Sequence, residues 1–127
     1  MRACFAGADS VAPACVGAAA NACQSGPGGS TTLGATDCLL AETGVWDELL
    51  NTTYKGARAR LLQQGGTALA DQLLDAQRAW IAFRDADCGL IYTIWVDGSI
   101  RTVLAADCQM RKTAQRALEL RDMGNMQ

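Results

Sequence analysis

The feature that most constrains this chain is a pair of long segments with helical hydrophobic periodicity, separated only by the glycine pair at residues 65–66. In residues 36–64 and again in residues 67–95, apolar side chains recur at steps of three, four or seven, which places them on one face of a helix. A glycine pair ends a helix, and Thr67 is a residue type that caps the next one. Since two helices joined by so short a turn must pack antiparallel, the sequence predicts a long helical hairpin.

Two further helices are expected outside this hairpin. Residues 11–24 form a short alanine-rich segment, and residues 102–122 again repeat apolar side chains at helical spacing. Residues 25–30 (Ser-Gly-Pro-Gly-Gly-Ser) and residues 96–99 (Val-Asp-Gly-Ser) have the composition of loops and turns. No alternating strand pattern or internal repeat is visible. We therefore expect one all-α domain over residues 1–127, a small bundle of about four helices built on the hairpin.

Six cysteines in 127 residues are an even and high number. No two of them have the Cys-x-x-Cys spacing that a zinc knuckle requires, and the chain contains no histidine. We therefore expect disulfides, which form in an oxidising compartment, and predict a disulfide-stapled bundle that is periplasmic or secreted. The cysteines are Cys4, Cys15, Cys23, Cys38, Cys88 and Cys108.

The first residues do not resemble a secretory leader, because Met1-Arg2-Ala3 is not followed by an apolar run. We expect Met1 to replace a leader that has been removed. An alternative is that Cys4 is the lipidated first residue of a lipoprotein, although Arg2 fits the lipidation signal poorly. The longest uncharged stretch, residues 10–36, is broken by Gly, Pro, Ser and Asn, so we expect no transmembrane segment.

Composition argues against catalysis and against several classes of partner. Without histidine, the chain has no Ser-His-Asp or Cys-His nucleophile pair. The glycine-rich loop lacks the lysine of a phosphate-binding loop. A formal net charge of −2 disfavours nucleic acid and anionic membranes as partners. We therefore expect a protein that is not an enzyme and that needs no cofactor or metal.

The short turn also predicts which residues face each other across the hairpin, because their numbers should sum to about 131. Asp47 then faces Arg84, and a carboxylate that meets an arginine with two hydrogen bonds fixes the register. Tyr54 faces Gln77 in the same way. Glu42 is a second candidate partner for Arg84. The polar network expected at this interface consists of Glu42, Asp47, Asn51, Tyr54, Gln77 and Arg84.

This network has a catalytic alternative. Glu42 and Asp47 are two carboxylates on one segment, as in the acid/base pair of a glycosidase. However, a neighbouring arginine lowers a carboxylate's pKa and makes it a poor general acid. We therefore interpret the network as structural.

The same residues resemble a family pattern that covers about residues 36–120, the LprI-like family. This is a bacterial domain long classed as of unknown function and later named after a lysozyme inhibitor. Residues 4–23 resemble a subset of the family that has an extra N-terminal helix. The resemblance implies an exported, mostly helical, disulfide-bonded envelope protein and, for at least one member, inhibition of lysozyme. The pattern consists of Glu42, Trp46-Asp47, Leu50-Asn51, Tyr54, Gln77, Trp80-Ile81, Arg84-Asp85, Cys88 and Cys108.

The resemblance also implies that Cys88 and Cys108 form the bridge shared by the family. This bridge would join the end of the second hairpin segment to the start of the C-terminal helix. The other four cysteines then allow three connectivities. We favour the two pairs that each close a short local connection, Cys4–Cys15 and Cys23–Cys38.

Inhibition of a lysozyme or another peptidoglycan-cleaving enzyme by protein–protein binding is the first functional hypothesis. Residues 1–50 hold one arginine against five acidic residues, a net charge of −4, whereas the remainder holds ten basic against eight acidic residues, a net charge of +2. Lysozymes are commonly basic and work with two carboxylates in a cleft, so an acidic partner would be steered towards them.

The candidate inhibitory element is the turn of residues 96–101, which lies between Cys88 and Cys108 and contains Asp97, Ser99 and Arg101. A bridged loop loses little freedom on binding. Arg101 is the candidate partner for the enzyme's carboxylates, with Ser99 as a hydrogen-bonding group beside it. The plain alternative is that Asp97-Gly98-Ser99 is an ordinary tight turn and that Arg101 is a solvated helix start.

The second hypothesis is a non-inhibitory interaction or structural domain of the envelope, or an immunity protein against a secreted effector. Residues 88–96 form an apolar run that is wider than one helical stripe. Most such runs are core, but an exposed part marks a partner surface. On this hypothesis Ile91, Ile94 and Trp95 form a homodimer or partner contact.

Overall fold

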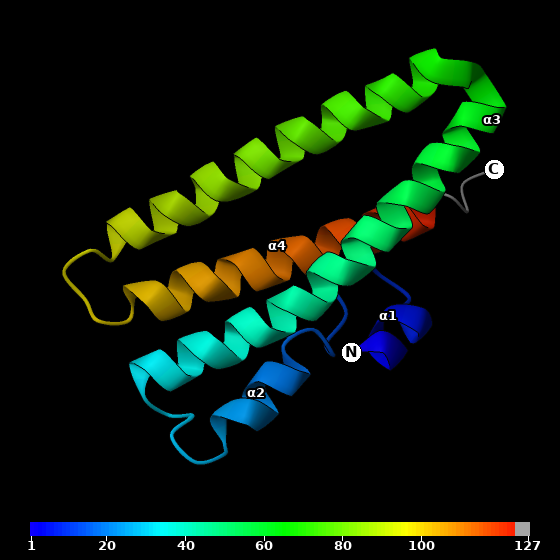
Figure 1. Cartoon of the computed structure of the whole chain (residues 1–127). Helices are drawn as coiled ribbons and strands as arrows, with labels where there is room; N and C mark the ends of the chain where they lie inside the picture. The colour runs from blue at the N-terminus through cyan, green and yellow to red at the C-terminus, as the bar shows by residue number, and fades with distance from the viewer. Residues whose placement is uncertain (124–127) are drawn as a thin grey trace.

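The computed structural model describes residues 1–123 and contains, within them, four helices and no strand (Figure 1). In chain order they are α1 (Arg2–Gly7), α2 (Ala18–Gln24), α3 (Thr32–Ile94) and α4 (Arg101–Met123). Three disulfides join segments of this bundle. The expected all-α, disulfide-stapled fold is confirmed.

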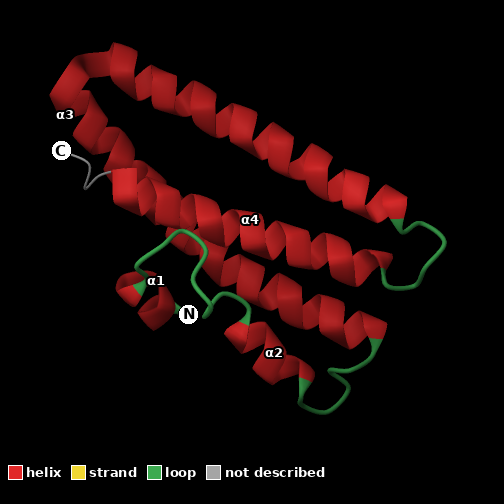
Figure 2. Cartoon of the chain, turned by 180° about the vertical axis from the view of Figure 1, so that it is seen from behind, coloured by secondary structure: helices red, strands yellow, loops and turns green. Residues whose placement is uncertain are grey.

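Helix α3 is the expected hairpin, drawn as one element with a kink at Gly66. This glycine has φ 72° and ψ −166°, a conformation that is almost restricted to glycine. The kink divides α3 into a first arm (residues 32–65) and a second arm (residues 67–94), which diverge from it like the sides of a V (Figures 1 and 2). The first arm begins earlier than residue 36, because the Thr31 side chain caps it by accepting a hydrogen bond from the Gly34 amide at 2.9 Å.

Helix α4 fills the space between the two arms (Figure 1). It runs parallel to the first arm, where the Thr36 and Thr102 hydroxyl oxygens lie 3.3 Å apart. It runs antiparallel to the second arm, to which it is joined by the Cys88–Cys108 bridge. The bundle is therefore a layer of three long helical segments in which α4 separates the arms.

The hydrophobic core forms where α4 meets the arms. Trp46 of the first arm and Met110 of α4 are fully buried. Ala114 and Ala117, which the periodicity places on the same face as Met110, are also fully buried. Because these side chains are small, the backbones of the neighbouring helices can approach α4 closely. Leu39, Leu50, Leu73 and Leu120 complete much of this cluster.

The helix expected over residues 11–24 is wrong in its first half. Helix α2 begins only at Ala18, because Gly17 precedes it with a left-handed φ of 92°. Residues 11–17 form turns, in which the Val16 amide donates to the Pro13 carbonyl at 3.2 Å. The short helix α1, which lies before them, was not expected from the sequence.

Helix α1 is attached to the end of α4. The Arg121 guanidinium donates to the carbonyl oxygens of Phe5 and Ala8, the latter at 2.9 Å, and lies over the Phe5 ring. These carbonyls belong to the C-terminal end of α1, where a cation also interacts favourably with the helix dipole. The N-terminal segment is thus part of the folded domain.

The disulfides have the pairings favoured above. The first ties α1 to the turns that follow it, the second ties α2 to the first arm, and the third ties the second arm to α4. The three pairs are Cys4–Cys15, Cys23–Cys38 and Cys88–Cys108.

Within residues 1–123, no helical stretch combines the length and the hydropathy that crossing a bilayer requires.

Candidate functional site

The polar network expected across the hairpin does not form, and the predicted Asp47–Arg84 pair is wrong. The Arg84 Nε donates instead to Asp85 Oδ1 at 3.0 Å, and its guanidinium lies 5.0 Å from the centroid of the Trp80 ring. Asp47 and Asn51 are exposed on the first arm. Because α4 lies between the arms, these residues are kept apart from Arg84.

The predicted Tyr54–Gln77 pair is also wrong. Gln77 Oε1 accepts a hydrogen bond from Arg116 Nε of α4 at 2.9 Å. The Tyr54 hydroxyl is buried and has no hydrogen-bond partner within residues 1–123. Gln77 of the second arm therefore bonds to α4, where the hairpin register predicts the first arm.

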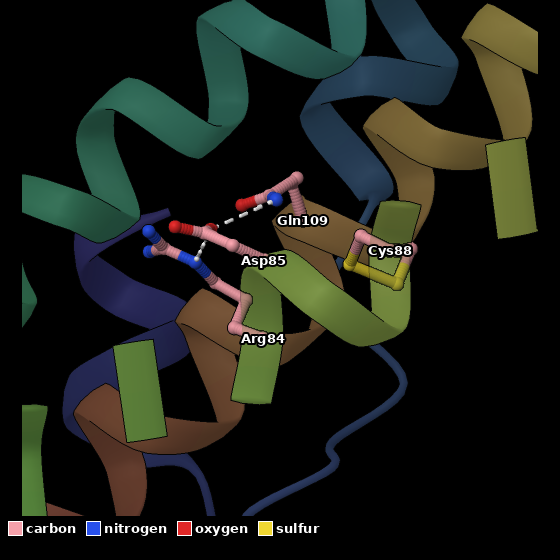
Figure 3. A network of polar contacts seen from close by, with 5 residues as sticks. Arg84, Asp85, Cys88 and Gln109 are labelled. Carbon is pink, nitrogen blue, oxygen red and sulfur yellow. Dashed lines mark hydrogen bonds and ion pairs between the residues drawn. A yellow bond between two sulfur atoms is a disulfide. The ribbon is translucent and has the colours of Figure 1, made fainter. Parts of the chain in front are cut away.

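A smaller polar group connects the second arm to α4 beside the third disulfide (Figure 3). Asp85 Oδ1 accepts from Arg84 and also from Gln109 Nε2 at 3.3 Å. The hydrogen bond from Arg84 lowers the pKa of Asp85, and its effect is larger than that of partial burial, which raises the pKa. The hydrogen bond from Gln109 and the positive charge of Arg84 lower the pKa further. Cys88 lies one turn further along the same helix. These contacts support the α3–α4 junction and leave the Asp85 carboxyl as a poor general acid.

Glu42 has a different role from the one expected, because it neither meets Arg84 nor faces solvent. Its carboxylate is fully buried and accepts three hydrogen bonds. Oε2 accepts from the Gly17 amide and the Trp46 indole Nε1, each at 2.8 Å, and Oε1 accepts from the Ala20 amide at 2.9 Å. Glu42 thus caps the start of α2 and fixes it against the first arm. The sequence signal that was missed is a glutamate four residues before a tryptophan on the buried stripe.

The segment between α3 and α4, residues 95–100, is here named the tip. It lies at the open end of the V (Figure 1), and the Cys88–Cys108 bridge joins the two helices that flank it. Arg101 is bound to its own loop: Nε donates to the Tyr92 hydroxyl at 3.0 Å, and Nη1 donates to the carbonyls of Val96 and Gly98 at 3.3 and 3.2 Å. Arg101 is therefore a clamp that holds the tip rather than a solvated side chain.

The outward surface of the tip combines polar and apolar side chains. Asp97 and Ser99 are exposed, as the candidate inhibitory loop requires. Trp95 is 49% exposed, and Val96 and Ile100 are exposed to a similar degree. The outward surface of the tip is therefore partly apolar.

A groove of about 440 Å³ opens beside the tip, between the second arm and α4. Ile91, Trp95 and Leu104 form its apolar wall. Of the residues expected in a homodimer or partner contact, Ile91 is half-buried, whereas Ile94 and Trp95 are exposed. Among the described residues, no three Cys, Asp or Glu side chains are grouped in a way that could hold a metal ion.

Comparison with known proteins gives one family match. The model of a family described as lysozyme inhibitor LprI matches residues 23–120. The matched range includes both arms of α3, the tip and most of α4, together with two of the three disulfides. No curated protein and no solved structure matches the chain.

Proposed function

The chain belongs to the LprI family, and from this premise we propose that it is an exported bacterial envelope protein that inhibits a lysozyme or a related peptidoglycan-cleaving enzyme. The observation that carries the proposal is the family match over residues 23–120, which includes the whole hairpin and the tip. Three disulfides support export, because such bridges persist in oxidising compartments.

The tip is the element best suited to enter an enzyme's cleft. It projects from the open end of the V, and the third disulfide joins the two helices that flank it. Two hydrogen bonds from Arg101, to the Val96 and Gly98 carbonyls, hold its backbone in one shape, and a third, to the Tyr92 hydroxyl, ties Arg101 to the second arm. A segment that is ordered before it binds loses little conformational entropy on binding, which favours inhibition.

Charge supports the encounter with a basic enzyme. Residues 1–50 contain five acidic residues and one arginine, a net charge of −4, and of the acids only Glu42 is buried. Asp37 and Asp47 are exposed on the first arm, which runs to the same open end of the V as the tip. Long-range attraction between this surface and a basic lysozyme raises the association rate, more strongly at low ionic strength.

The test is inhibition of cell-wall lysis by a panel of basic lysozymes, with purified protein whose disulfides are intact. The variant Ser99→Glu adds a carboxylate to the tip, which the carboxylates of the enzyme's cleft repel. We expect inhibition to weaken at least tenfold, about 1.4 kcal/mol. The matched control is Ser30→Glu, which adds the same charge at an exposed serine in the loop before the first arm.

Equal inhibition by Ser99→Glu and the wild-type protein would remove the tip from the mechanism. Absence of inhibition with every lysozyme and muramidase tested would contradict the proposal itself. In that case the alternative function, a non-inhibitory envelope interaction domain or an immunity protein, would account for the exposed apolar residues. Arg101 is unsuitable for this test, because its replacement also releases the tip backbone.

A further inference from the structure

The second arm carries a second apolar stripe whose side chains are exposed, although the Lys112 ammonium of α4 lies 4.9 Å from the centroid of the Phe83 ring. Its inward face packs on α4 through buried residues such as Leu73 and Cys88. On a separate face, exposed apolar side chains recur at steps of three and four over five helical turns, the pattern of a helix that packs against a partner helix. We name this set the outer stripe; it consists of Ala76, Ala79, Phe83, Ala86, Leu90 and Ile94.

The outer stripe is exposed because of the architecture. Helices α1 and α2 lie on the side of the first arm and α4, so the second arm forms an uncovered edge of the bundle (Figures 1 and 2). Phe83, Leu90 and Ile94 are 58%, 55% and 61% exposed. An exposed apolar side chain needs no explanation singly, but a continuous helical row of them marks an interaction surface.

Side-chain sizes along the stripe are complementary to the same stripe turned end to end. When two second arms are placed antiparallel so that facing residues have numbers summing to about 170, every large residue faces an alanine. Alternation of large and small residues across facing positions is the arrangement that lets helices interdigitate. A parallel alignment would instead place large on large and alanine on alanine. The facing pairs are Phe83 with Ala86, Leu90 with Ala79, and Ile94 with Ala76.

Two hollows lie beside the stripe, between the second arm and α4. One hollow, of about 160 Å³, is lined by Trp80 and Phe83, level with the place where Leu90 of a second copy would lie. The groove of about 440 Å³ is lined by Asp87 and Ile91, level with Phe83 of the second copy. Two of the three large side chains, Leu90 and Phe83, thus lie level with a hollow on the other copy.

The area of this face is sufficient for a reversible dimer. The stripe spans residues 76–94, a helix length of about 27 Å. Two such faces packed at the usual interhelical distance would bury on the order of 1,000 Å² in total, the lower limit for a specific interface. The expected dimer is therefore dependent on concentration rather than permanent.

We propose that this chain forms a homodimer through the outer stripe, with the second arms antiparallel about a two-fold axis near residue 85. An isologous contact of this kind needs one self-complementary patch, which is what the stripe provides. The antiparallel arrangement places the two tips at opposite ends of the interface, so both stay accessible. The proposal does not depend on lysozyme inhibition.

The first experiment is sedimentation velocity over about a hundredfold range of concentration, which brackets a weak dissociation constant. We expect the wild-type protein to change from monomer to dimer and Leu90→Glu to weaken the dimer at least tenfold. The matched control is Leu33→Glu, which changes a leucine of the first arm that is also exposed, at 72% against 55% for Leu90. Wild-type protein that stays monomeric throughout would overturn the proposal, as would a dimer unaffected by Leu90→Glu.

The second experiment tests the register. Ala79→Lys and Leu90→Glu should each be monomeric, with helical circular dichroism and melting temperature close to the wild-type values. When they are mixed, the new lysine faces the new glutamate, and the two copies should form a heterodimer. Dimers in the mixture but in neither variant alone would support the antiparallel contact. Failure of two folded variants to associate would overturn it.

Discussion

Replacing Glu42 by alanine should destabilise the fold severely, because the carboxylate is the acceptor for three buried donors. These are the amides of Gly17 and Ala20 and the indole of Trp46, each within 2.9 Å. An unsatisfied buried donor costs about 1–3 kcal/mol, so three would cost up to about 9 kcal/mol. Water that enters the vacated space recovers part of this cost. We therefore expect a loss of about 3–5 kcal/mol, a large part of the roughly 5–15 kcal/mol that a domain possesses.

Glu42→Gln should cost less. The amide oxygen can keep the two hydrogen bonds to Gly17 and Trp46, but its NH₂ group then faces the Ala20 amide, donor against donor. The loss of one hydrogen bond to a charged group corresponds to about 1.5–3 kcal/mol. The free energy of unfolding should therefore be lowest for Glu42→Ala, intermediate for Glu42→Gln and highest for the wild-type protein. This order would show that Glu42 acts as a hydrogen-bond acceptor.

The measurement is urea unfolding followed by circular dichroism, with the disulfides intact. The matched control is Glu48→Ala: Glu48 is ion-paired with Arg2 at 3.2 Å, and both side chains are about 70% exposed. An exposed pair of this kind contributes at most about 1 kcal/mol. If Glu42→Ala cost no more than Glu48→Ala, the capping role of Glu42 would be refuted.

The remaining predictions use the same unfolding measurement. Gly66→Ala should lower the free energy of unfolding by about 1–3 kcal/mol, because its positive φ strains any other residue. Gly56→Ala, in a helix interior with open space at its Cβ, should raise the free energy of unfolding by about 0.5–1 kcal/mol. Changes of the same sign in the two variants would contradict this contrast. Tyr54→Phe should be neutral or stabilise by up to about 1 kcal/mol, because it removes a buried hydroxyl without a partner in residues 1–123; a clear loss would show that the hydroxyl is bonded in solution. Arg84 lowers the pKa of Asp85 in the folded state, so the ionised Asp85 contributes stability above its ordinary pKa of 3.8, and this stability is lost as the pH falls through the lowered pKa. Asp85→Asn should therefore lower the free energy of unfolding at neutral pH, by less than about 1 kcal/mol for so exposed a side chain. This difference from wild type should disappear in acid.

The hairpin register could be predicted near the kink and not far from it. A sum of about 131 places Arg58 opposite Leu73, and in the structure the Arg58 guanidinium lies 3.8 Å from the carboxylate of Asp71, two positions away. Further from the kink, the rule fails for Asp47 and Arg84. The rule assumes that the arms stay in contact, whereas α4 enters the V and displaces them. Periodicity within one segment reports that a face is buried, but not which segment buries it.

Local features were easier to predict than long-range ones. Two of the disulfides close short loops, so proximity in sequence was sufficient to favour their pairing. The clamp role of Arg101 is also local, but its bonds to loop carbonyls depend on a backbone shape that residue types alone do not define. Two of the three partners of Glu42, Gly17 and Ala20, lie more than twenty residues away, at the start of α2. No spacing rule connects such segments.

The divergence of the arms also explains why the outer stripe and the tip are neighbours: the stripe lies on the second arm, and the tip directly follows that arm. The first arm packs on α4 and α2, while the second arm packs mainly on α4. The Cys88–Cys108 bridge is the covalent link between the second arm and α4, and Cys88 lies within the length of the outer stripe, shortly before the tip. A tip that enters a cleft must keep one shape, and a stripe that pairs with a second copy must stay straight. Both requirements depend on the second arm remaining fixed to α4, so loss of this bridge should impair both surfaces together.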